Sequence, residues 1–310
     1  MSVSKVLVHV ADRATGWSVA ADRLKAQQEM ARWTVFGLSI AGALMAALAS
    51  QIPIDKGDDF LRLAHTYVAM SSAALLAMAT FVSSRFLGQA KSSAWVRARA
   101  ASEALKREAF KFAARAAPYD IADPAMAEEL LKTEYDKINT SAETVAHPVH
   151  DPGRPGSSPR ALLTPDAYRT QRVLDQAHKF YQVKAARYLK TAKVLKRAEF
   201  VFAAAATLIS VYAGAVGKTV IGSGLSFDIA ALTAVLTTVS GAVLTHIEAS
   251  RLDHLVDTYT ATARRLEDQD LAFDKAREDP AAWSTFVNQC EDIIAAENAS
   301  WVAKWADEKA

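Results

Sequence analysis

The sequence contains a single cysteine, Cys290, among 310 residues. It can therefore form no intrachain disulfide, no zinc site with several thiolates and no CxxC redox pair. Charge is also missing in places: Asp, Glu, Lys and Arg are absent from four long windows, although the chain has 36 Lys and Arg and 34 Asp and Glu. The mean hydropathy near zero is thus an average over apolar and charged segments, a pattern typical of membrane proteins with large soluble parts.

The four uncharged windows predict four transmembrane helices. They contain 22, 22, 18 and 19 residues and run from Trp33 to Ile54, Leu63 to Ser84, Phe200 to Gly217 and Ile229 to Ile247. At a rise of about 1.5 Å per residue, such helices reach roughly 27–33 Å, close to the hydrocarbon thickness of about 30 Å. The third window is the shortest and gives the weakest prediction.

The spans form two hairpins, because only eight residues (55–62) join the first pair and eleven (218–228) join the second. Orientation follows from the Lys and Arg residues within about 20 residues of the span ends. Seventeen of them flank the hairpins on the side of the termini, whereas only Lys56, Arg62 and Lys218 lie in the short loops. This excess predicts that both termini and the segment between the hairpins are cytoplasmic.

Helix signals continue outside the spans. Asp123-Pro124, Thr164-Pro165 and Asp279-Pro280 each place a capping side chain before a proline at the first helical position. The helix that starts at Pro165 meets no breaker before the third span. Residues 139–164 hold a Pro-, Gly- and Ser-rich stretch without apolar periodicity, which predicts a flexible linker.

These observations predict an all-α integral membrane protein in which two tandem transmembrane hairpins carry long cytosolic helical extensions. The predicted domains are residues 1–138, with the first hairpin, and 165–310, with the second, joined by the linker 139–164. The basic flank of the third span, Lys184 to Arg197, favours contact with anionic lipids on the cytosolic side.

A heptad pattern follows the second span. Its residues are spaced alternately by three and four positions, which is typical of a seam between helices: Trp95, Ala98, Ser102, Leu105, Ala109 and Phe112. We interpret Trp95, Ala98, Ser102, Leu105 and Phe112 as a candidate contact between copies in a homo-oligomer.

The segments around the hairpins resemble a known family. The residues from Trp95 to Tyr119 read WVRARAASEALKREAFKFAARAAPY; in the second half, FYQVKAARYLKTAKVLKRAE (180–199) precedes the hairpin and CEDIIAAENASWVAKW (290–305) follows it. This order resembles the SLATT proteins, the SMODS and SLOG-associating two-transmembrane effectors, as two domains in tandem over nearly the whole chain.

The resemblance implies a bacterial inner-membrane effector of nucleotide-dependent conflict or anti-phage systems. It further implies a protein that oligomerises and breaches the membrane when a separate protein, which senses or synthesises a nucleotide, signals infection. The family offers no catalytic residues, and neither a cofactor nor a nucleic-acid partner is expected.

The fourth span carries hydroxyl and small side chains at a spacing of four: Thr233, Thr237, Gly241 and Thr245, with Thr238 beside them. One interpretation is a pore lining, in which hydroxyl groups form a wettable wall without fixed charge. The other, which we favour, is close helix packing, since small residues allow helices to approach and threonine can bond to its own backbone.

The last helix carries Glu291, Glu297, Trp301 and Trp305, which match the family-like tail and predict a contact with another helix, with the membrane interface or with a partner. No catalytic, cofactor or metal site emerges. The segment GAVGKT (214–219) ends like a phosphate-binding loop but lacks the first glycine of that motif. We therefore predict a non-enzymatic, pore-forming effector; the alternative is a membrane-anchored scaffold or receptor for a cytosolic partner.

Overall fold

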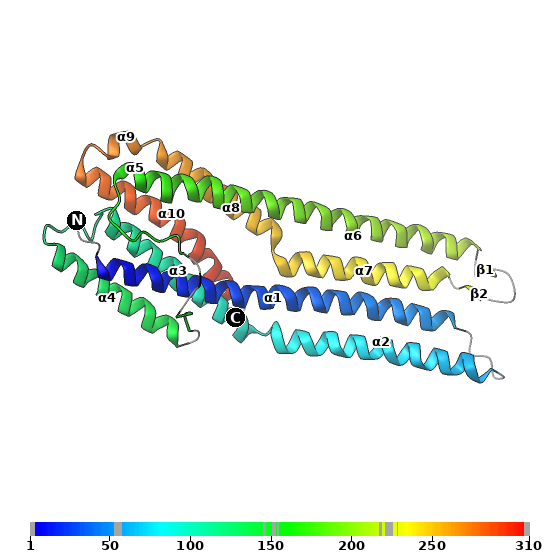
Figure 1. Ribbon diagram of the computed structural model, residues 1–310. Coiled ribbons are helices and arrows are strands. Elements are labelled where there is room, and N and C mark those ends of the chain that lie inside the picture. Colours follow the sequence, from blue (N-terminus) through cyan, green and yellow to red (C-terminus); the bar gives the residue numbers. More distant parts are fainter. Residues whose placement is uncertain are drawn as a thin grey trace. The chain divides into compact units, whose positions relative to one another are not determined.

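The computed structural model describes residues 4–52, 58–144, 147–150, 153, 155–216, 219–220, 226–227 and 229–306. Its elements, labelled in Figure 1, are α1 (Lys5–Gln51), α2 (Asp59–Phe86), α3 (Gln89–Ala113), α4 (Pro124–Glu143), α5 (Pro165–Tyr168), the π-helix η1 (Arg169–Gln182), α6 (Val183–Val216), β1 (Thr219–Val220), β2 (Ser226–Phe227), α7 (Ile229–Ser250), α8 (Leu252–Asp270), α9 (Phe273–Ala276) and α10 (Pro280–Ala306). The two short strands pair antiparallel, with Thr219 opposite Phe227.

Four helical runs are long and apolar enough to cross a membrane: Lys5–Gln51, Asp59–Phe86, Pro165–Ala215 and Ile229–Asp270. The prediction of an all-α protein with four spans is therefore confirmed. The third span, the shortest in sequence, is as apolar as the fourth. Ile54 and Gly217, where the first and third spans were predicted to end, lie outside the described residues.

The predicted helix starts are confirmed. Asp123 accepts a hydrogen bond from the Ala125 amide at 2.9 Å and caps α4. Thr164 caps α5 in the same way, and from there one unbroken helical run continues through η1 and α6 to Val216, as Figure 1 shows. Helix α1 is likewise continuous from Lys5 to Gln51.

The chain folds as two compact units that do not follow the two halves of the sequence. Unit 1 comprises residues 1–27, 89–187 and 254–310; unit 2 comprises residues 28–88 and 188–253. The hairpins are consecutive along the chain, as predicted, but all four spans share unit 2. The predicted domain boundary at residues 139–164 stays a prediction, because the two compact units divide the chain at other positions.

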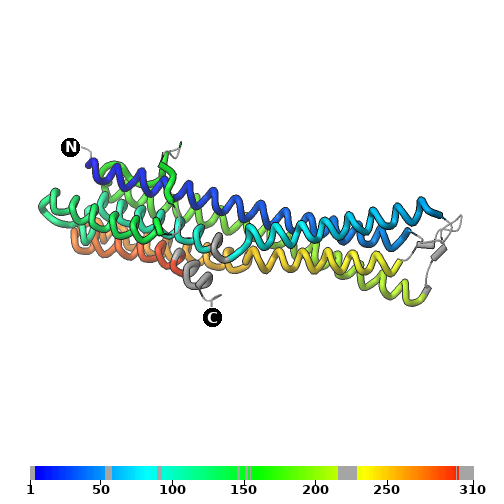
Figure 2. The backbone as a smooth tube through the Cα atoms, turned by 90° about the horizontal axis from the view of Figure 1, so that it is seen from below, coloured from blue at the N-terminus to red at the C-terminus, as the bar shows by residue number. Residues whose placement is uncertain are grey.

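In unit 2, the core lies where spans of the two hairpins meet. One face of α7 is buried through Val235, Val239, Val243 and Ile247, which pack against Phe36, Ile40 and Ala47 of α1 and Leu195 and Phe202 of α6. Within the first hairpin, α1 and α2 lie side by side (Figures 1 and 2), and the Ser72 hydroxyl donates to the Gly42 carbonyl at 2.8 Å. Gly42 permits this approach, because a side chain there would overlap Leu76.

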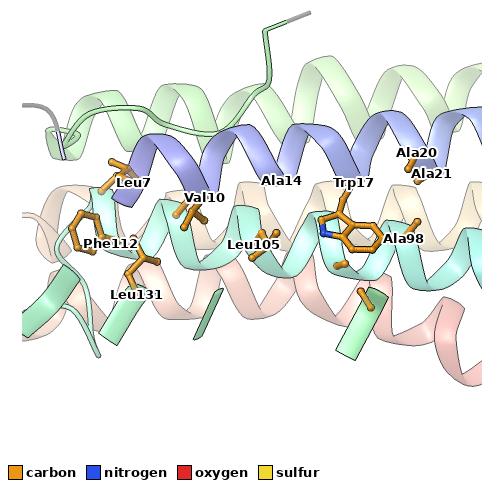
Figure 3. Close-up of a cluster of buried hydrophobic side chains, with 14 of the residues drawn as sticks. Leu7, Val10, Ala14, Trp17, Ala20, Ala21, Ala98, Leu105, Phe112 and Leu131 are labelled. Carbon is orange, nitrogen blue, oxygen red and sulfur yellow. The ribbon is translucent and has the colours of Figure 1, made fainter. Parts of the chain in front are cut away.

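The core of unit 1 joins α1, α3 and α4. Figure 3 shows Leu7, Val10 and Trp17 of α1 beside Leu105 and Phe112 of α3. The heptad residues interpreted as a contact between copies are all buried in this core: Trp95, Ala98, Ser102, Leu105 and Phe112. That interpretation is corrected here, because the seam is already filled by side chains of the same chain. The Ser102 hydroxyl, for example, donates to the Ala14 carbonyl of α1 at 2.9 Å.

The segment predicted as a flexible linker is in part structured. Its first residues, 139–143, belong to the end of α4. The Val149 amide donates to the Gly16 carbonyl of α1 at 3.2 Å, and the Leu163 amide donates to the Ala113 carbonyl of α3 at 2.8 Å. A side chain at Gly16 would overlap the Val149 carbonyl, so glycine is needed where the segment crosses α1.

Candidate functional site

Two of the four residues predicted in the family-like tail mark a buried group of charges in unit 1. Glu291 and Glu297 of α10 are 0% and 3% exposed, so neither is available to a partner protein in this conformation. Each instead forms an ion pair with a buried or nearly buried arginine of the same unit. The helix–helix contact predicted for Glu291 and Glu297 thus consists of ion pairs between α10 and other helices of unit 1. The side chains of Trp301 and Trp305 lie outside the described part of the chain.

The Arg172–Glu291 pair is the most deeply buried of these contacts. Arg172 Nε donates to Glu291 Oε1 at 2.9 Å and Nη2 donates to Oε2 at 2.7 Å, which makes a bidentate pair between η1 and α10. The Tyr168 hydroxyl donates to the same Oε1 at 3.1 Å. The side chains of the pair are 1% and 0% exposed, so the charges are separated from solvent.

Aromatic rings surround this pair. The Arg172 guanidinium lies 4.5 Å from the ring centre of Phe110 on α3, a cation–π contact. Tyr168 packs edge-on against Phe110 and Trp283, with ring centres 6.2 and 5.6 Å apart. Arg172 Nη1 is buried without a hydrogen-bond partner among the described residues.

A second pair ties α3 to α10. Arg99 Nη2 donates to Glu297 Oε1 and Oε2 at 3.1 and 3.3 Å. Burial alone would lower the pKa of Arg99, but the charge of Glu297, together with the contributions of Tyr259 and Glu103, outweighs burial and raises that pKa. We call Tyr168, Arg172, Glu291, Arg99 and Glu297 the buried charge cluster.

Neighbouring groups respond to the same charges. Burial alone would raise the pKa of Glu103, but the charges of Lys106, 2.8 Å away, and of Arg172 lower it to about 2. Burial raises the pKa of the Tyr168 hydroxyl well above its ordinary value, and the Glu291 carboxylate raises it further. Burial also raises the pKa of the Cys290 thiol, which is fully enclosed. These groups are therefore suited to structure rather than to proton transfer or nucleophilic attack at neutral pH.

The buried charge cluster connects parts of the chain that are far apart in sequence. Arg99 lies on α3, which follows the second span, whereas Glu291 and Glu297 lie on α10, beyond the fourth. Arg172 lies in η1, which continues directly into α6 and the third span. Breaking a buried pair by removing one partner typically costs about 3–5 kcal/mol, because the other charge is left buried. The cluster therefore fixes α10 against both α3 and η1.

The π-helical geometry of η1 explains which side chains reach the cluster. A π-helix bonds each amide to the carbonyl five residues back and is usually a single turn near a functional site. Here it continues for 14 residues, and its buried residues are Arg172, Val173, Ala177 and Tyr181, with Tyr168 just before it. Apart from the adjacent Arg172 and Val173, they lie four or five positions apart. This spacing is wider than the 3.6 residues of an α-helical turn, so no α-helical periodicity in the sequence indicates it.

The threonines of the fourth span lie apart from the cluster, in unit 2. Thr237, Thr238 and Thr245 are exposed, and their hydroxyls donate to the carbonyls four residues earlier, each at 2.8 Å. Thr233 is half-buried, and its hydroxyl has no hydrogen-bond partner among the described residues. Nothing in the described chain lies within 4 Å of a side-chain carbon placed at Gly241. Thr237, Thr238, Gly241 and Thr245 therefore lie on an exposed face of α7.

Residues 168–301 match the family of SMODS and SLOG-associating 2TM effector domain 1. The match covers 134 of the 310 residues, so the second half of the chain is similar to the SLATT effector domains. The SLATT region includes the third and fourth spans and four residues of the buried charge cluster: Tyr168, Arg172, Glu291 and Glu297. Arg99 lies outside the SLATT region, so Glu297 of that region forms its ion pair with a residue of the first half of the chain.

The first half matches a different family. Residues 15–127 match a protein of unknown function, DUF4231, which includes the first hairpin and α3. The tandem arrangement is thus supported in part, with SLATT assigned to the second half. No curated protein and no solved structure matches the chain. Among the described residues, no group of three His, Cys, Asp or Glu side chains is placed to hold a metal ion.

Proposed function

We propose that this protein is an effector of a bacterial nucleotide-dependent conflict or anti-phage system, which oligomerises and opens a pore or disrupts the inner membrane on signalling. The observation that carries the proposal is the SLATT region, described as a two-transmembrane effector domain, in a chain whose four spans share one compact unit. The spans have no Asp, Glu, Lys or Arg in their middle. Ion-coupled transport needs ionisable groups deep within the membrane, so the uncharged spans fit a passive leak of ions better than coupled transport.

The buried charge cluster supports a closed resting state. It holds α10 against η1, and η1 continues without a break into the third span. A signal that separates Glu291 from Arg172 would release this helix, and the helix would transmit the change to the membrane. We infer that the signal comes from a protein that senses or synthesises a nucleotide, and that both termini are cytoplasmic, where such a partner would reach unit 1.

The exposed face of α7 supports assembly. Thr237, Thr238 and Thr245 have satisfied hydroxyls and short side chains, so the face can approach another helix closely or line a wet passage. We propose that Thr237, Thr238, Gly241 and Thr245 face other copies of the chain in the oligomer. Packing between copies and pore lining are then two roles of the same face.

Inducible expression in a bacterium with a membrane-potential dye tests the proposal. Thr237→Leu fills the proposed contact and should abolish depolarisation. Thr207→Leu is the matched control, because Thr207 on α6 is also exposed within a span and also donates to its own helix, to Ala203 at 2.9 Å. Equal effects of both substitutions would reject a special role for α7.

The alternative function is a membrane-anchored scaffold or receptor that binds a cytosolic partner. It predicts a stable complex with that partner and no change in membrane potential. If neither wild type nor Glu291→Gln depolarises cells, even with neighbouring nucleotide-signalling genes expressed, the pore is excluded and the scaffold is favoured.

A further inference from the structure

The helix that leads into the third span is unusually basic. From Lys184 to Arg197 it carries six Lys or Arg residues and no Asp or Glu. The corresponding stretch before the first span, residues 17–32, carries three basic residues, and Asp22 and Glu29 offset two of them. The two hairpins therefore enter the membrane from different electrostatic surroundings.

Three of these cations lie on one exposed face of α6. Lys190, Lys193 and Arg197 are spaced by three and four residues, which places them on one side of an α-helix. All three are exposed, and none forms an ion pair among the described residues. Lys196, in contrast, points to another side and pairs with Asp253 at 2.7 Å.

The same face continues into the span as apolar surface. Phe200, Val201 and Leu208 follow Arg197 at spacings of three, four and eleven residues, and they are 70%, 59% and 71% exposed. The opposite face of α6 is the packed one: Ala192 and Ala206 are buried there, and Leu195 and Phe202 contact the core of unit 2. In a bilayer, Phe200, Val201 and Leu208 face hydrocarbon, so the three cations face lipid as well.

The distances along the helix fit the headgroup layer. Arg197 lies three residues before Phe200 and Lys190 lies ten, which corresponds to about 5 and 15 Å along the axis. The polar layer on each side of a bilayer is roughly 5–8 Å thick. Arg197 and Lys193 thus reach headgroups, and Lys190 lies within about one Debye length, 8–10 Å, of them.

We propose that Lys190, Lys193 and Arg197 bind the phosphate of anionic phospholipids at the lipid-facing side of the third span, with the acyl chains along Phe200, Val201 and Leu208. The acidic groups nearby do not compete for these cations, because Asp253 is paired with Lys196 and Glu199 accepts a hydrogen bond from Ser240 on the packed side. The site requires only that the spans lie in a bilayer, and it holds whether or not the protein conducts ions.

Native mass spectrometry of the full chain, titrated in detergent with phosphatidylglycerol or phosphatidylcholine, measures this preference. Wild type should bind the anionic lipid more tightly. A Lys190→Gln, Lys193→Gln, Arg197→Gln variant should lose roughly fivefold in affinity per cation, about a hundredfold in all, with the affinity for phosphatidylcholine unchanged. A variant with Lys190→Arg, Lys193→Arg and Arg197→Lys should keep the preference, because it keeps the three positive charges. This control distinguishes the loss of charge from a defect in folding.

The matched control removes three exposed cations from unit 1: Lys132→Gln, Lys137→Gln and Lys179→Gln, whose side chains are 59%, 65% and 75% exposed. It should leave lipid binding as in wild type. The proposal is overturned if the control loses affinity equally, or if the first variant keeps its preference. It is also overturned if inorganic phosphate at millimolar concentration displaces the lipid, since the site would then take a free anion.

Discussion

Removing one member of the Arg172–Glu291 pair should destabilise unit 1 far more than breaking an exposed pair of equal length. In Arg172→Met, Glu291 keeps the Tyr168 hydroxyl, at 3.1 Å, as its one side-chain partner among the described residues, in a position that is 0% exposed. In Glu291→Leu, a guanidinium that is 1% exposed loses both of its charge-assisted hydrogen bonds. An unpaired buried charge of this kind costs about 3–5 kcal/mol in free energy of unfolding.

The double variant gives the sharper test. With Arg172→Met and Glu291→Leu together, no charge remains, and apolar side chains of similar volume fill the space between η1 and α10. Replacement of a buried pair in this way is neutral or stabilising by about 1–4 kcal/mol. The Tyr168 hydroxyl retains the Val287 carbonyl at 3.4 Å. The stability of the double variant should therefore lie near or above that of wild type.

Thermal unfolding in detergent measures these differences. For a unit of this size, 1 kcal/mol shifts Tm by roughly 2–4 °C, so each single variant should lower Tm by about 6–20 °C. The control is Lys137→Met, which breaks an exposed pair with Glu134 at the same distance of 2.7 Å and should cost at most about 1 kcal/mol. If Arg172→Met lowers Tm no more than Lys137→Met, or if the double variant is as unstable as the singles, the reasoning from burial is refuted.

Further predictions follow from neighbouring residues. Cys290, the only thiol, should resist maleimide until α10 opens, and Glu291→Gln should accelerate its labelling at least tenfold; equal rates in both proteins would show that α10 is not held by this pair. The pKa of Glu103 is lowered to about 2, so its stabilisation is complete above pH about 4.5 and is lost as pH falls towards 2. In unfolding experiments, Glu103→Gln should reduce this loss of stability at low pH. An unchanged pH dependence of stability would contradict the assigned pairing with Lys106. Gly16→Ala should lower stability by about 1–3 kcal/mol through its clash with Val149, whereas Gly37→Ala, with open space around it, should not; chemical denaturation distinguishes the two.

Much of the fold follows from local patterns in the sequence. The four spans are uncharged runs of sufficient length, and the helix starts are marked by Asp123, Thr164 and Asp279, so each can be predicted without knowing what packs against it. The pairing of helices cannot, because it depends on residues far apart. The heptad from Trp95 to Phe112 was interpreted as a seam between copies, since its spacing is the same whether the partner helix belongs to another chain or, as here, is α1.

The buried charge cluster was predicted only in part. Glu291 and Glu297 were identified within the family-like tail, but a glutamate near the end of an amphipathic helix is usually solvated, so their burial is not evident from sequence. Arg172 and Arg99 were not identified. Arg172 reaches the core through the wide turns of η1, and no α-helical periodicity reveals that position. An arginine directly before Val173, four residues after Tyr168 in a largely polar stretch, was the only available signal.

Unit 1 is assembled from three separate segments, and this affects the order of events during synthesis. Residues 1–27 and 89–187 leave the ribosome before the third and fourth spans, whereas α10, with Glu291 and Glu297, follows all four. Arg172 and Arg99 therefore have no acidic partner on α10 until every span has been made. At about 5–20 residues per second, that interval lasts several seconds for Arg172 and longer for Arg99. The cluster thus closes only after all four spans have been made, and a chain that terminates before α10 would carry four spans but would leave Arg172 and Arg99 without their acidic partners.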